Sequence, residues 1–239
     1  MLGIIGGVGP DATARLYQTL MRLSASEAEG ALPRLLLYNL AMTPRIENAY
    51  LSGCINAASP ERIDAQELLS EAMICCQRSG VECIIMPCNT LQDELAALCK
   101  ARRISHVNMI DETAAAVVAA NARRILVLGT ASTCQEDLYG KRLLQHQVTC
   151  VYPQADAQRA IEHFIRQILD FHHAQELPPS FLQLVRELGS ECDGVLVACT
   201  DLSGKLSQAQ FHKPVFDSLE CLAQAAARWI RGQRSARGR

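Results

Sequence analysis

Short apolar runs alternate with longer amphipathic segments along most of the chain. Runs rich in Ile, Val and Leu predict strands within residues 2–10, 33–42, 81–90, 106–111, 123–133, 148–154, 195–203 and 213–218. The segments between them have helical spacing. Residues 59–80, for example, begin with Ser and Pro and end with Gly, which are typical helix-boundary residues. Strands that alternate with helices predict an α/β fold with parallel sheets.

The order of these segments repeats within the chain. IIGGVG in the first half corresponds to LVLGTAST in the second, IIMPCNT to VLVACTD, and HVNMIDETAAAV to KPVFDSLECLAQ. Each half therefore offers a strand with a small-residue turn, a strand ending in Cys, and a strand ending in Asp before a helix. We expect two similar lobes related by a pseudo-twofold axis. Residues 1–105 and 212–239 would form the first lobe, and residues 106–211 the second.

Composition narrows the class of protein. A chain of 239 residues is long enough for two such lobes, and its net charge of −2 gives no indication of a nucleic-acid or membrane partner. The eleven cysteines include no C-x-x-C pair, and no His stands at ligand spacing from them, so we expect no metal site. No apolar run reaches the ~18 residues that span a bilayer. We expect a cytoplasmic protein with free thiols.

Two cysteines stand out because their surroundings match. Cys88 and Cys199 each follow an apolar strand and precede small polar residues, at corresponding positions of the two halves. Because ligands of open α/β sheets bind at the carboxyl ends of strands, we expect the two thiols to face each other across one cleft. The alternative is that each is a buried packing residue, which is the common state of a single cysteine.

Two facing thiols suit one kind of reaction. A helix N-terminus lowers the pKa of a nearby thiol, so we expect reactive thiolates here. One thiolate removes a proton from a stereogenic carbon and the other thiol returns a proton on the opposite face, which is a racemase or epimerase without a cofactor. Polar residues beside the thiols and in the Gly turns are expected to hold a carboxylate: Asn89, Thr90, Thr130, Thr133 and Thr200. A cysteine protease would need a His near the thiol, and none is near in the sequence.

Five segments in order resemble the aspartate/glutamate racemase family: GIIGGVGPDAT at 3–13, MPCNT at 86–90, MIDETA at 109–114, LGT at 128–130 and ACTDLS at 198–203. The resemblance implies racemisation of amino acids without pyridoxal phosphate or another cofactor. It implies two Rossmann-like lobes with the active site between them, and usually a homodimer. Cys88 and Cys199 would be the acid/base pair. Asn89, Thr90, Thr130 and Thr200 would hold the α-carboxylate and amino group.

The sequence departs from the family at positions that bear on the substrate. Asp201 stands where the family commonly has Glu. Aspartate-specific members hold the distal carboxylate with an Arg and a Lys, and the aligned positions here are Glu47 and Asp170; Arg45 lies two residues from the first. Two acids in place of two cations predict a racemase of basic amino acids such as lysine, arginine and ornithine, or one of broad range. The alternative is that both acids face solvent.

Three other functions stay open at this point. The chain is compatible with a racemase of aspartate or glutamate, or with another isomerase or a decarboxylase on the same fold. It is also compatible with an amino-acid binder that has no catalytic activity.

Overall fold

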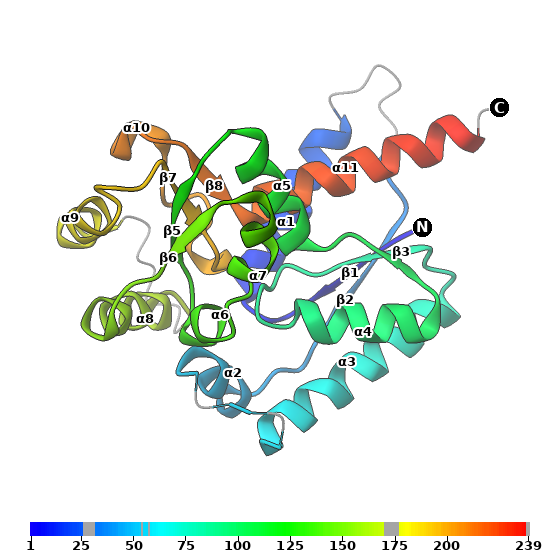
Figure 1. The fold of residues 1–239 in the computed structure, drawn as a ribbon. Helices are drawn as coiled ribbons and strands as arrows, with labels where there is room; N and C mark the ends of the chain where they lie inside the picture. The colour runs from blue at the N-terminus through cyan, green and yellow to red at the C-terminus, as the bar shows by residue number, and fades with distance from the viewer. Residues whose placement is uncertain (26–31, 54, 57, 170–176, 238–239) are drawn as a thin grey trace.

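Two parallel sheets form the centre of the molecule (Figure 1). The computed structural model describes residues 1–25, 32–53, 55–56, 58–169 and 177–237. The first sheet contains β1 (Leu2–Gly6), β2 (Leu35–Asn39), β3 (Cys83–Ile85) and β4 (Ser105–His106), in the order β2-β1-β3-β4. The second contains β5 (Arg124–Leu128), β6 (Thr149–Val151), β7 (Gly194–Val197) and β8 (Val215–Asp217), in the order β6-β5-β7-β8. The two orders are equivalent, so the predicted fold of two similar α/β lobes is confirmed.

Helices surround both sheets (Figure 1). The helices are α1 (Pro10–Ala25), α2 (Pro44–Leu51), α3 (Pro60–Arg78), α4 (Gln92–Arg102), α5 (Met109–Ala119), α6 (Ala131–Gln135), α7 (Gly140–Leu143), α8 (Ala155–Leu169), α9 (Pro179–Leu188), α10 (Gln208–Phe211) and α11 (Ser218–Arg237), with 3-10 turns at Leu144–His146 and Thr200–Leu202. Residues 134–147, expected as one helix, are broken where Asp137 has a φ of 52°. Within the described residues, no helix combines the length and the apolarity that a membrane span requires.

The two lobes exchange their last helices. The apolar face of α11 packs on the first sheet, where Leu219 and Leu222 join Ile4 in one core cluster. The preceding strand β8 pairs with β7 in the second sheet. Residues 212–239, predicted to belong to the first lobe, thus contact both sheets, because β8 completes the second sheet before the chain crosses back to the first. The lobe boundaries stay a prediction. Conversely, Val117 of α5 joins Val127 of β5 in the core cluster of the second sheet.

In the third repeated segment, the residue that corresponds to Asp217 lies three positions before the one that the sequence comparison predicted. The predicted strand ending at Asp111 is wrong, because β4 ends at His106 and Asp111 lies in the first turn of α5. The carboxamide of Asn108 caps that helix by accepting from the backbone N–H of Asp111. In the second half the carboxylate of Asp217 does the same for α11. Asn108 is thus the counterpart of Asp217.

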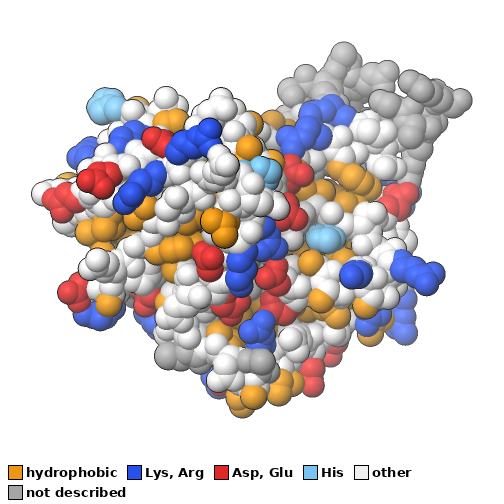
Figure 2. Space-filling model, viewed as in Figure 1, with side chains coloured by type: hydrophobic (Ala, Val, Ile, Leu, Met, Phe, Trp, Pro, Cys, Tyr) orange, Lys and Arg blue, Asp and Glu red, His pale blue; other side chains and the backbone are white. Residues whose placement is uncertain are grey.

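Acidic and basic side chains are interspersed on the face drawn in Figure 2. Neither sign forms a large continuous patch there. This view agrees with the small net charge of the chain. It gives no indication of a polyanionic partner on that face.

Candidate active site

Cys88 and Cys199 lie at equivalent places in the two lobes. Cys88 comes three residues after the end of β3, and Cys199 two residues after the end of β7. Each of these strands lies second from one edge of its sheet, beside β1 and β5 respectively. Both thiols line one cavity between the lobes, with Val8, Gly9, Met42, Glu47, Tyr50, Leu51, Asn89, Thr90, Leu91, Thr130, Thr133, Leu169, Ala198, Thr200 and Asp201. The structure therefore brings together two residues 111 positions apart (199 − 88).

Polar contacts hold the two cysteine loops. The thiol of Cys88 lies 3.2 Å from the hydroxyl of Thr90. The thiol of Cys199 donates to Oδ2 of Asp201 at 3.5 Å. Both cysteine residues are only 5% exposed. Each thiol thus sits beside one polar side chain within a site that excludes most solvent.

Burial raises the pKa of both thiols, contrary to the sequence prediction of lowered values. For Cys88 the pKa rises to about 11, although the Thr90 hydroxyl and nearby backbone N–H groups oppose the change. For Cys199 burial and then the Asp201 carboxylate raise the pKa further. The expected helix dipoles are weak here, because α4 begins only at Gln92 and the turn after Cys199 has three residues. Burial therefore favours the thiol form of both cysteines in the free site, and a positive charge beside them would favour the thiolate.

Asp201 is the carboxylic acid that accepts the hydrogen bond from the Cys199 thiol. Its pKa is raised to about 6, first by burial and then by the charges of Glu47 and Asp11, while the hydrogen bond from Cys199 opposes the rise. Above that pH it is a carboxylate that accepts the thiol hydrogen. Asp201 is thus able to take part in the protonation equilibrium of Cys199 near neutral pH.

The Gly-rich turn after β1 makes room for Asp201. Gly9 has a φ of 78°, and a Cβ atom on it would meet Oδ1 of Asp201 at 2.6 Å. Only glycine combines that conformation with such a close approach. The turn therefore accommodates a carboxylate of the protein itself.

The threonines expected to hold a carboxylate have defined positions. Thr130 caps α6, and its hydroxyl lies 3.0 Å from that of Thr133. Thr200 donates from Oγ1 to the carbonyl oxygen of Pro87 at 3.2 Å. With Asn89 and Thr90, these side chains line the cavity from both lobes. They form a polar wall around the two thiols.

Helix α2, which the sequence pattern did not reveal, covers one side of the cavity. It supplies Glu47, Tyr50 and Leu51 to the lining. Its backbone is tied to the second lobe because Ser132 donates from Oγ to the carbonyl oxygen of Tyr50 at 2.5 Å. The sequence did contain one indication of this helix, the pair Thr43–Pro44. Thr43 caps the helix and Pro44 occupies its first position, which is a typical helix start.

The three residues predicted to contact the substrate side chain differ in their placement. Glu47 lines the cavity. Arg45 is outside the lining and is 54% exposed in its side chain, where it forms ion pairs with Glu61 and Asp64 on α3. Asp170 lies outside the described residues; Leu169 before it lines the cavity.

The fold and the site together define an α/β protein of two similar lobes with a cavity between them. The family model for Asp/Glu/Hydantoin racemase matches residues 5–226. The chain belongs to this family. It is therefore an isomerase of the racemase type that acts on small amino-acid-like substrates, and independence of pyridoxal phosphate fits this family.

Individual relatives are distant but cover almost the whole chain. The broad specificity amino-acid racemase RacX of Bacillus subtilis is 24% identical over 229 residues, which is 94% of this chain and 96% of the relative. The aspartate racemase of Picrophilus torridus has a TM-score of 0.74 at 23% identity, covering 96% of this chain and 93% of its own. An aspartate racemase homologue from Pyrococcus horikoshii has a TM-score of 0.76 at 22% identity, covering 96% and 98%. These structures share the fold of this chain.

Proposed function

We propose that the protein racemises free amino acids with Cys88 and Cys199 as the two acid/base groups. The observation that carries this proposal is that the two thiols line one cavity from corresponding strand ends of opposite lobes. In one direction Cys88 first loses its thiol proton to solvent as the substrate binds. The resulting thiolate removes the proton from Cα, and the electron pair moves into the carboxylate to give an enolate-like species. The Cys199 thiol then donates its proton to the opposite face of Cα. Cys88 ends as a thiol and Cys199 as a thiolate, and the reverse direction exchanges these roles.

The substrate itself supplies what the buried thiols lack. Its α-ammonium group brings a positive charge next to them, which favours the thiolate form. Asp201 accepts from Cys199 at rest and is placed to assist the exchange of that proton. Asn89, Thr90, Thr130 and Thr133 provide donors for the α-carboxylate and for the charge that develops on it. The hydroxyl of Thr200, expected from the sequence to do the same, instead donates to the carbonyl oxygen of Pro87.

We also propose that the substrate side chain is basic or neutral. Among the described residues that line the cavity, the charged ones are Glu47 and Asp201, and both are acidic. A distal ammonium or guanidinium group would be attracted by Glu47, whereas a distal carboxylate would be repelled. Arg45 is held away from the cavity by its acidic partners on α3. The name of the Bacillus relative specifies broad specificity, which supports a range wider than one amino acid. Asp170 lies outside the described residues and stays a candidate for the same role on the basis of the sequence alone.

A panel of single enantiomers tests both parts of the proposal. Chiral chromatography of lysine, arginine, ornithine, alanine, aspartate and glutamate is expected to show racemisation, fastest for basic or neutral side chains. Cys88→Ser and Cys199→Ser are each expected to abolish it. Faster turnover of aspartate than of lysine would overturn the charge assignment. Ligand-induced thermal stabilisation without turnover would indicate a binder, and a product other than the enantiomer would indicate a different reaction.

Glu47→Gln tests the side-chain assignment directly. It is expected to lower kcat/KM for lysine and arginine by about tenfold, equivalent to about 1.4 kcal/mol, and to leave alanine unchanged. Glu67→Gln is the matched control, because Glu67 is exposed on α3 and lies outside the cavity lining. An equal effect of Glu47→Gln on alanine and lysine would contradict the assignment. The homodimer and the cytoplasmic location expected from the sequence stay predictions.

A further inference from the structure

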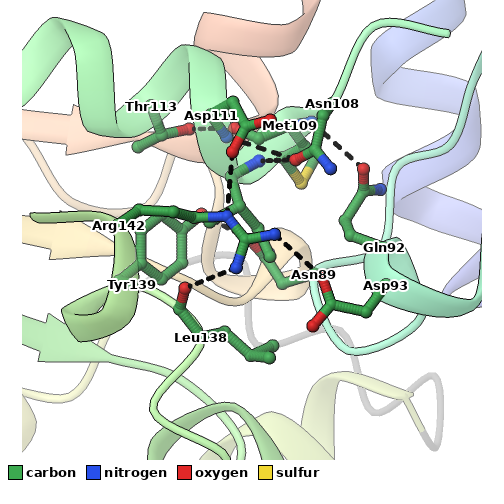
Figure 3. A network of polar contacts seen from close by, with 11 residues as sticks. Asn89, Gln92, Asp93, Asn108, Met109, Asp111, Thr113, Leu138, Tyr139 and Arg142 are labelled. Carbon is green, nitrogen blue, oxygen red and sulfur yellow. Dashed lines mark hydrogen bonds and ion pairs between the residues drawn. The ribbon is translucent and has the colours of Figure 1, made fainter. Parts of the chain in front are cut away.

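Asn89 is held from two sides next to Cys88. Its Oδ1 accepts from the hydroxyl of Tyr139 at 2.6 Å, and its Nδ2 donates to Oγ of Ser218 at 3.2 Å. Asn89 is 4% exposed, and Tyr139 and Ser218 are fully buried. Asn89 follows β3 in the first lobe, while Tyr139 comes from the turn before α7 in the second lobe (Figure 3). A contact between the lobes therefore reaches a side chain of the cavity wall.

Tyr139 acts as a fixed hydrogen-bond donor. Burial raises the pKa of its phenol, although contacts with the hydroxyls of Thr113 and Ser218 oppose the rise. The phenol therefore keeps its proton at neutral pH and donates it to Oδ1 of Asn89. This contact decides which end of the amide is the oxygen. One N–H of Asn89 then goes to Ser218. The second N–H has no hydrogen-bond partner among the described residues, and Asn89 lines the cavity.

The backbone around Asn89 is secured independently of Tyr139. Gln92, which is fully buried, donates from Nε2 to the carbonyl oxygens of Met86 and Cys88 at 2.9 and 2.8 Å. Its Oε1 accepts from the backbone N–H of Met109 at 3.1 Å (Figure 3). The loop that carries Cys88 is thus held by Gln92 within its own lobe. Removal of the Tyr139 hydroxyl should free the Asn89 amide and leave the thiol in place.

The turn that carries Tyr139 is also well anchored. Arg142 donates from Nε to Oδ1 of Asp111 and from one terminal nitrogen to Oδ1 of Asp93, both at 2.8 Å. Its other terminal nitrogen donates to the carbonyl oxygen of Leu138 at 3.1 Å (Figure 3). Asp93 lies in the first turn of α4, just after the Cys88 loop. The Tyr139 hydroxyl therefore has a defined position relative to Asn89.

We propose that Tyr139 is a positioning residue of the racemase: it orients the Asn89 amide so that one N–H is presented to the α-carboxylate of the substrate. The inference rests on the proposed function and concerns the part of the substrate that all amino acids share. Its effect should therefore be the same for every side chain, in contrast to that of Glu47.

Tyr139→Phe tests the inference, because it removes only the hydroxyl. We expect KM to rise about tenfold for lysine and alanine alike, the effect of losing one oriented hydrogen bond, while kcat changes less than threefold. Asn89→Ala should raise KM by at least as much. The double variant Tyr139→Phe/Asn89→Ala should be no worse than Asn89→Ala, because Tyr139 would act only through Asn89. Additive effects of the two changes would overturn the inference.

Tyr152→Phe is the matched control. The hydroxyl of Tyr152 donates to Asp137 at 2.5 Å and accepts from the backbone N–H of Gly140. Asp137 and Gly140 lie in the same turn as Tyr139. Tyr152→Phe should lower Tm as Tyr139→Phe does and leave KM unchanged. Equal increases of KM in both variants would mean that loosening the turn is enough, and would overturn the inference. If the wild type racemises no amino acid, the proposed function fails; calorimetric Kd values for an amino acid in the same variants then decide the inference by the same criteria.

Discussion

Thr200 donates a hydrogen bond from its hydroxyl to the carbonyl oxygen of Pro87, which lies 113 positions earlier in the chain. Thr200 follows Cys199 and Pro87 precedes Cys88, so this single bond ties the two cysteine loops together. The relative position of the thiols therefore depends on a contact between the lobes. The proposed two-thiol racemisation requires the thiols to stay on opposite faces of one carbon atom, which makes this contact a target for testing.

Thr200→Val is expected to reduce both stability and turnover. It removes the donor and leaves the Pro87 carbonyl oxygen without its partner, a cost of about 1–2 kcal/mol in the free energy of unfolding. Racemisation should slow because the two loops lose their common anchor. Thr200→Ser keeps the hydroxyl and should keep most of the activity. Denaturant unfolding and chiral rate assays check this, and equal activity of the Val and Ser variants would contradict it.

Asp201 should set a lower pH limit on activity. Its pKa of about 6 means that it loses its charge below that pH and can no longer accept the hydrogen of Cys199. We expect kcat/KM to fall on the acid side of pH 6. In Asp201→Asn the rate should be low and this limb of the pH profile absent. A profile of the variant that keeps the limb would assign it to another group.

The same substitution should stabilise the protein at high pH. Burial raises the pKa of Asp201 from 3.8 to about 6, so its ionisation destabilises the fold as the pH rises from about 3.8 to about 6, and the loss is complete above that range. A shift of about two pH units corresponds to roughly 3 kcal/mol as an upper value. Asp201→Asn should therefore raise Tm more at pH 8 than at pH 4. Scanning calorimetry at the two pH values measures the difference, and equal gains would contradict the linkage.

Tyr50→Phe should also stabilise the protein. Tyr50 is 6% exposed, and its hydroxyl has no hydrogen-bond partner among the described residues. An unsatisfied buried hydroxyl costs about 1–3 kcal/mol, so its removal should raise Tm. Tyr139→Phe is the contrasting change, because that hydroxyl donates to Asn89 and its loss should lower Tm. A decrease of Tm in Tyr50→Phe would show that its hydroxyl is satisfied in solution.

Gly9→Ala is expected to damage both the fold and the site. The added methyl group would meet Oδ1 of Asp201 at 2.6 Å, and the φ of 78° is unfavourable for alanine. We expect a loss of about 1–2 kcal/mol in stability and a large loss of activity. Gly232→Ala is the control: a Cβ there meets nothing within 4 Å in helix α11, so stability should rise slightly. Unchanged activity in Gly9→Ala would show that Asp201 need not approach Gly9.

Local pattern accounts for the parts of the fold that the sequence predicted. Apolar runs specify buried parallel strands, and their repetition places Cys88 and Cys199 at equivalent strand ends. The hydrophobic pattern did not predict a helix where a short segment has little hydrophobic periodicity. Helix α2 has eight residues, and its packing against the second lobe through the Tyr50 carbonyl is a tertiary effect. The end of the third repeated segment was misplaced because an Asn and an Asp fill the same capping role.

The sequence by itself determined the two-lobe architecture, the family and the two cysteines, because strand periodicity and motif order are local properties that survive without knowledge of contacts. Only the tertiary structure decided the protonation of the site. It raised the pKa of both thiols through burial, placed Asp201 against Gly9, and directed Arg45 toward α3 and Glu47 toward the cavity. It also brought Tyr139 to Asn89 across 50 positions of chain. Desolvation and long-range hydrogen bonds depend on which distant side chains meet, and no local pattern encodes that.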